Sequence, residues 1–163
     1  MPRAARFLWF RGAAVLLLSL WALTSIAAAA SPEGMWLTAG KNGVVEVFRC
    51  AADGDTLCGR LAWFRIKPGD RNAQGLDLNN PDPKLRGRSL CGLIFMYGFR
   101  PAGPDSWEDG AVYDPESGNT YHGTISLRPD GRLALRGYIG ISLFGRSEVW
   151  SSYTEPLPSC PSR

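Results

Sequence analysis

The sequence predicts an all-β protein, a single antiparallel barrel of about eight strands. Short segments rich in Val, Ile, Tyr, Phe and Trp recur about every 8–12 residues, and turns rich in Gly, Asn, Asp and Pro separate them. No apolar repeat with the helical period of about 3.6 residues continues for more than about two turns. The strands are expected at 34–38, 44–50, 57–66, 90–99, 109–114, 120–127, 132–140 and 145–153.

Turn chemistry supports the hairpins between these strands. Asn42-Gly43 separates the first two strands, and Asp53-Gly54-Asp55 separates the second from the third. Pro129-Asp130-Gly131 marks a later turn of the same kind. The segment 67–89 breaks this rhythm, because it is a long polar connection with three prolines. Loops of this length in small domains usually act as lids or as flexible insertions, so we expect a polar lid here.

Residues 1–30 have the pattern of a secretory signal. Three arginines precede the apolar run AAVLLLSLWALTSI, which is shorter than the roughly 20 residues needed to cross a bilayer. Ala28 and Ala30 then provide a small-residue cleavage site. We therefore expect a Sec-type export to the periplasm or the medium, with a mature chain from about Ser31 and no lasting membrane insertion. An uncleaved N-terminal anchor is the alternative, and without a cysteine near the site a lipoprotein is not expected.

The net charge excludes one class of partner. The whole chain has 18 basic and 15 acidic residues, a net charge of +3. Arg3, Arg6 and Arg11 account for this excess, so the chain after residue 30 carries no net charge. A general basic field for nucleic acid or anionic lipid is therefore absent, and no nucleic-acid partner is expected.

Four cysteines in an exported chain indicate two disulfides, with three arrangements open. Cys50 and Cys58 flank the predicted second hairpin turn and would face each other across it. This favours Cys50–Cys58 and leaves Cys91 with Cys160, which would fasten the C-terminal tail at 154–163. A zinc site is disfavoured, because the chain has no C-x-x-C motif and a single histidine.

The single histidine is not expected to be catalytic. His122 falls in the strand 120–127, where a period of two places it with Thr124 and Ser126 on a polar face. No G-x-S-x-G motif accompanies it, and paired cysteines offer no free thiol. Asp114 and Glu116 could act as the carboxylate pair of a glycoside hydrolase, which remains an alternative.

The first predicted strand opens with Gly34-Met35-Trp36. A Gly-x-Trp at this place resembles the start of lipocalin-like barrels, in which the tryptophan closes the barrel floor beneath a basic residue of the last strand. The resemblance implies that Trp36 is buried at the floor. It also implies that Arg146, which belongs to the last predicted strand, lies over the indole ring.

A second resemblance covers about residues 31–153. The Gly-x-Trp motif is followed in order by GRLAW, DLNNPDPKLRGRSLCGL, YDPESGNTY and LRGYIGISLFGRSEVW. In this order the motifs resemble the exported bacterial family catalogued as domain of unknown function 2147. The resemblance implies a lipocalin-like barrel outside the cytoplasm, and it implies no catalytic residue and no cofactor.

We therefore expect an exported lipocalin-like binding protein, rather than an enzyme, for a small apolar ligand or an envelope component. The alternatives are an envelope glycan hydrolase and a structural envelope protein with a filled barrel. A homodimer is a further expectation, because the strand 90–99 is apolar on both faces and its outer face needs cover from the tail, the lid or a second copy. The residues expected to line the barrel or its lid are Trp36, Trp63, Ile94, Met96, Tyr121, Ile125 and Arg146.

Overall fold

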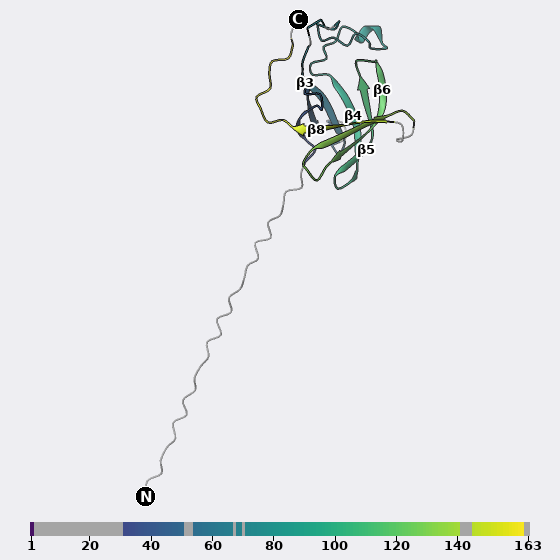
Figure 1. Cartoon of the computed structure of the whole chain (residues 1–163). Helices are drawn as coiled ribbons and strands as arrows, with labels where there is room; N and C mark the ends of the chain where they lie inside the picture. The colour runs from purple at the N-terminus through teal and green to yellow at the C-terminus, as the bar shows by residue number, and fades with distance from the viewer. Residues whose placement is uncertain (2–30, 51–53, 67, 70, 141–144, 162–163) are drawn as a thin grey trace.

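The computed structural model describes Met1 and residues 31–50, 54–66, 68–69, 71–140 and 145–161. The described residues form eight antiparallel strands that close into one barrel, which confirms the predicted fold class (Figure 1). The strands are β1 (Gly34–Leu37), β2 (Gly43–Arg49), β3 (Leu57–Phe64), β4 (Ile94–Gly103), β5 (Ser106–Asp114), β6 (Asn119–Leu127), β7 (Leu133–Tyr138) and β8 (Gly145–Ser152). Apart from Met1, the predicted signal at 1–30 lies outside the described residues, as does the hairpin tip at 51–53.

Each strand pairs with the next strand along the chain, and β1 pairs with β8 to close the barrel. The closing register places Trp36 opposite Ser152 and Leu37 opposite Ser151. Closure satisfies the backbone groups that an edge strand would leave unpaired. Among the described residues, no helix is long and apolar enough to cross a membrane.

Apolar side chains fill one end of the barrel. This closed end is packed by Trp36, Val47, Leu57, Met96, Phe99, Trp107, Ile125, Leu127, Leu133 and Trp150, among others. Phe99 reaches the centre because two facing strands carry glycine beside its ring. A Cβ atom at Gly110 or Gly123 would lie within 2.4 or 2.8 Å of Phe99 atoms, so no larger residue fits there.

Trp36 lies at this closed end and is 5% exposed. Its indole Nε1 donates a hydrogen bond to the Pro32 carbonyl oxygen at 2.8 Å. The predicted stacking of Arg146 on this ring is wrong. Ser152 is the β8 residue beside Trp36, and Arg146 precedes it by six positions, about 20 Å along a strand. Arg146 instead pairs with Gly137 at the other end of the barrel, where it is exposed.

Two disulfides cross-link the described part of the chain. Cys50–Cys58 links β2 to β3 across their hairpin, with the two Cα atoms 5.2 Å apart. Cys91–Cys160 ties the C-terminal tail to the residues that precede β4. The pairing is the one that the hairpin turn predicts, and it fixes the tail against the end of the barrel opposite Trp36.

The long connection between β3 and β4 lies over this second end, which we call the open end (Figure 1). The described part of this connection folds back on itself through a bridge between Leu76 and Ser89 and contains a short 3₁₀ helix, Pro83–Leu85. Beneath it lies a second, smaller apolar cluster of Leu90, Leu93 and Tyr113, with Leu61, Phe64 and Phe95 packed against it. Leu90 and Leu93 therefore hold the end of this connection against the barrel through apolar contacts.

Candidate functional site

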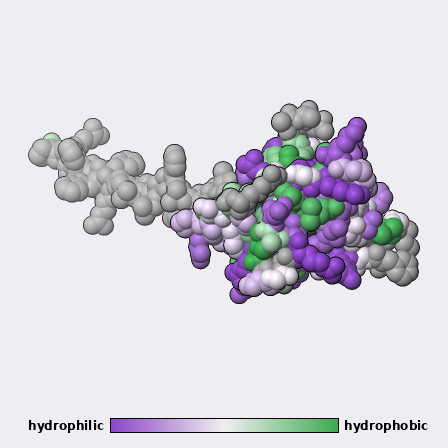
Figure 2. Space-filling model, turned by 90° about the horizontal axis from the view of Figure 1, so that it is seen from above, coloured by the Kyte–Doolittle hydropathy of each residue, from purple (hydrophilic) through white to green (hydrophobic). Residues whose placement is uncertain are grey.

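A cavity of about 850 Å³ lies at the open end, between the barrel interior and the lid. Strands β2, β3, β4, β5, β7 and β8 contribute its apolar wall, which includes Val45, Leu61, Phe95, Val112, Leu135 and Trp150. Polar groups from the lid and the strand ends border it, among them Asn42, Arg65, Arg71, Asn72 and Asn79. Figure 2 looks onto this end and shows hydrophobic residues at the centre of the face, bordered by hydrophilic ones.

The cavity ends directly on the packed core. Leu135 and Trp150 belong to the core cluster and also line the cavity, so the two parts of the barrel interior are continuous.

Three carboxylate residues line this cavity, Asp114 and Glu116 at the β5–β6 turn and Glu148 on β8. The register places Glu148 opposite Leu135 on the inward face of β8. The Trp150 indole Nε1 donates a hydrogen bond to Glu148 Oε2 at 2.8 Å, which orients the carboxylate. Within the described part of the chain no cation lies within ion-pair distance of Glu148. It therefore remains available to a ligand.

A buried acid fastens the lid to the barrel. Asp77 is 0% exposed and accepts hydrogen bonds from Tyr113 Oη at 2.6 Å, Asn80 Nδ2 at 2.7 Å and Arg88 Nε at 2.7 Å. Burial disfavours the charged carboxylate, but these hydrogen bonds outweigh it and hold the pKa of Asp77 below its ordinary value. Burial and the neighbouring carboxylate raise the pKa of Tyr113, which stays protonated as the donor.

The lid is also hydrogen-bonded to the turn between β5 and β6. Asn79 Nδ2 donates to the carbonyl oxygen of Glu116 at 2.8 Å and to that of Pro115 at 3.3 Å. Gly118 is required in this turn, because a Cβ atom there would lie 2.1 Å from the Asn79 carbonyl oxygen. The motifs DLNN and YDPESGNTY, which are about 35 residues apart in the sequence, are therefore in direct contact in the folded protein.

The remaining polar residues of the two motifs have local roles. Asp82 caps the 3₁₀ helix by accepting from the Lys84 N–H at 2.9 Å. Asp114 accepts from the Glu116 N–H at 2.9 Å and from Ser117 Oγ at 2.7 Å, so both of its oxygens stabilise the turn. In the part of the chain that the structure covers, His, Cys, Asp and Glu do not gather into a group that could hold a metal ion.

His122 is exposed on the outer face of β6, and its ring centre lies 5.7 Å from that of Tyr138. Its neighbours Gly123 and Ile125 are buried, which agrees with the alternation predicted from sequence. The polar face is the outer face.

The seven residues expected to line the barrel or its lid do not line this cavity. Trp36, Met96 and Ile125 belong to the filled closed end. Trp63 is half-buried, with the Arg65 guanidinium 5.9 Å from its ring centre, and Tyr121 is also half-buried. The prediction for Ile94 is wrong, because this side chain is 50% exposed on the outside. An irregular register between β3 and β4 shifts the alternation there, and Phe95 takes the inward position.

Sequence reasoning missed the residues that do line the cavity, above all Glu148 and Leu135. A usable signal was present in SEVW, since a period of two puts Glu148 on the same face as the buried Trp150. The outer face of β4 also stays uncovered by the tail and the lid, with Ile94 and Tyr97 50% and 44% exposed.

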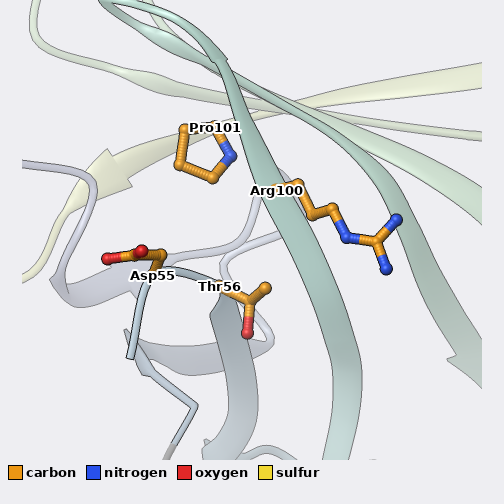
Figure 3. A pocket seen from close by; sticks show the side chains of 4 residues that line it. All are labelled: Asp55, Thr56, Arg100 and Pro101. Carbon is orange, nitrogen blue, oxygen red and sulfur yellow. The ribbon is translucent and has the colours of Figure 1, made fainter. Parts of the chain in front are cut away.

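A second hollow, at the closed end, is a shallow depression beside the β2–β3 hairpin (Figure 3). It is lined by Asp55, Thr56, Arg100 and Pro101. Figure 3 shows the Arg100 side chain pointing away from Asp55, so the two charges do not converge on one ligand. Thr56 Oγ1 is buried there without a hydrogen-bond partner. The cavity at the open end is the better candidate site because it is larger and because side chains of six strands and of the lid line it.

Residues 34–152 match the model of a bacterial family described as uncharacterized protein conserved in bacteria, DUF2147. The chain belongs to this family. Its fold is similar to that of HP1028 from the human pathogen Helicobacter pylori, a protein described as belonging to the lipocalin family. The two share 23% identity with a TM-score of 0.63, over 77% of this chain and 85% of that one. No curated protein matches the sequence. The DUF2147 chain is thus a lipocalin-like barrel.

Proposed function

We propose that this DUF2147 protein is an exported lipocalin-like binding protein that holds a small, mainly apolar molecule in the cavity at its open end. The cavity is the main observation that supports this proposal. Its volume of about 850 Å³ lies in the range of about 300–1,000 Å³ that is typical of small-molecule sites. Barrels of eight strands are just wide enough to hold one small ligand where side chains do not fill them.

The disulfides support export. Cys50–Cys58 and Cys91–Cys160 account for all four cysteines, and such bonds persist in oxidising compartments such as the periplasm. Together with the signal-like pattern of residues 1–30, they favour a protein that meets its ligand outside the cytoplasm.

A binding role is favoured over catalysis. The hydrolase alternative requires Asp114 and Glu116 as a working pair. Because both Asp114 oxygens hold the turn, this carboxylate has a structural role already. The alternative of a filled barrel with no ligand is disfavoured by the hollow between Leu61, Val112 and Leu135.

The experiment fills the cavity by mutation. Leu135→Trp adds an indole to the cavity wall, and Ile94→Trp adds the same group to the outer face as a matched control. Protein is isolated gently from the periplasm and native mass spectrometry is used to detect a bound molecule, followed by calorimetric titration with decanol. We expect the wild type and Ile94→Trp to bind and Leu135→Trp to lose at least tenfold in affinity. Equal binding by a folded Leu135→Trp variant would place the ligand elsewhere.

A further inference from the structure

The placement of Glu148 restricts what the cavity can hold. This carboxylate stands on the inward face of β8, between the mouth and the packed floor, with the apolar Leu135 as its cross-strand neighbour. Two positions further along β8 lies Trp150, which is 2% exposed and belongs to the core. Glu148 is nevertheless exposed, so water solvates its charge when no ligand is bound.

The protein orients this carboxylate without pairing it to a cation of the described chain. The Trp150 indole donates one hydrogen bond to Oε2, which fixes the carboxylate in the cavity. The cations that border the same cavity, Arg65 and Arg71, are exposed at its rim, and no ion pair joins either to Glu148. Arg146 lies on the same face two positions nearer the mouth, about 7 Å along the strand, and is also exposed without an ion pair to Glu148.

We infer that the ligand carries a protonated amine that pairs with Glu148, while its apolar body lies against the walls formed by Leu61, Phe95 and Val112. This inference rests on the proposed binding function and narrows it to one chemical class, an amphipathic amine. An ammonium group provides up to three hydrogen-bond donors for the free positions of the carboxylate. Because Glu148 is exposed, solvent partly screens this ion pair, and the contacts of the apolar body add to it.

Three ligands with the same ten-carbon chain separate this inference from the function on which it rests. Decylammonium, decanol and decanoate are titrated calorimetrically into purified protein at neutral pH, below their aggregation concentrations. The affinity for decanol measures binding to the cavity by an uncharged ligand. The affinities for the two charged ligands show whether the cavity favours a positive or a negative group. We expect decylammonium to bind about threefold to fivefold more tightly than decanol, and decanoate to bind more weakly than decanol.

The variant Glu148→Gln tests the residue. Its amide oxygen can still accept the Trp150 indole hydrogen, so the fold and the affinity for decanol should stay unchanged while the preference for the amine is lost. Glu108→Gln removes an exposed charge from β5 and serves as the control for net charge, with the preference retained. If decanol binds but the amine shows no preference, or if both variants lose it equally, the inference is overturned and the binding function stands. If none of the three ligands binds, the binding function fails as well.

Discussion

Asp77→Asn should release the lid from the barrel and destabilise the whole protein. The substitution keeps the size of the side chain but removes its charge, so the ion pair with Arg88 is lost in either rotamer of the amide. If the amide nitrogen takes the place of Oδ2, it meets the donors of Asn80 and Arg88; if it takes the place of Oδ1, the Tyr113 hydroxyl can turn and accept from it. The fully buried position offers no water as a replacement, whatever rotamer the amide takes.

The magnitude follows from the partners. Breaking a buried ion pair by removing one charge costs about 3–5 kcal/mol. The Arg88 side chain is 36% exposed and can be partly rehydrated, so the lower part of that range applies, about 2–4 kcal/mol. Tyr113→Phe removes one donor and leaves the ion pair intact, and should cost about 1–2 kcal/mol.

The pH dependence gives a second signature. The pKa of Asp77 in the folded protein lies below the ordinary value of 3.8, which applies to the unfolded chain. Its contribution to stability is therefore fully present above the unfolded pKa and is lost as the pH falls through the folded pKa. The difference in unfolding free energy between the wild type and Asp77→Asn should be constant near neutrality and shrink below about pH 4.

Urea unfolding followed by tryptophan fluorescence, at neutral pH and at several acidic values, measures both effects. Asp82→Asn is the matched control, because Asp82 lies in the same lid but is exposed, and only its cap on the 3₁₀ helix is weakened. It should cost less than about 1 kcal/mol. A loss of less than 1 kcal/mol in Asp77→Asn, or a difference that does not change with acid, would show that the buried carboxylate does not hold the lid.

Three further predictions follow from the two ends of the barrel and its outer face. Trp36→Ala should cost about 3–5 kcal/mol through the cavity it leaves, and combining it with Arg146→Ala should give an additive loss in a double-mutant cycle, since the residues lie at opposite ends. Non-additivity would contradict the register. Thr56→Val should stabilise the protein by about 1 kcal/mol in urea unfolding, because it removes a buried hydroxyl without a partner; a destabilised variant would reveal a partner for that oxygen. His122→Ala should change the unfolding free energy by less than about 0.5 kcal/mol, and a loss of several kcal/mol would mean that its face is packed.

The sequence alone determined the fold class and the outer face of β6. Strand periodicity and turn chemistry are local properties, and for this reason they predict eight strands and place His122 outside before any contact is known. The hairpin turn likewise favoured Cys50–Cys58, since residues that flank a tight turn lie close together, although the register pairs Cys58 with Phe48. The burial of Trp36 followed from the resemblance of its Gly-x-Trp motif to the start of lipocalin-like barrels.

Only the tertiary structure decided which residues line the cavity. The irregular register between β3 and β4 places Phe95, and not Ile94, on the inward face of β4. Because both residues are hydrophobic, the sequence pattern does not show which of them faces inward. The position of Arg146 depended on how far β8 slides against β1, which no local pattern specifies. The Asp77–Tyr113 lock joins segments 36 residues apart, and its buried carboxylate is stable only because folding brings three donors around it at once.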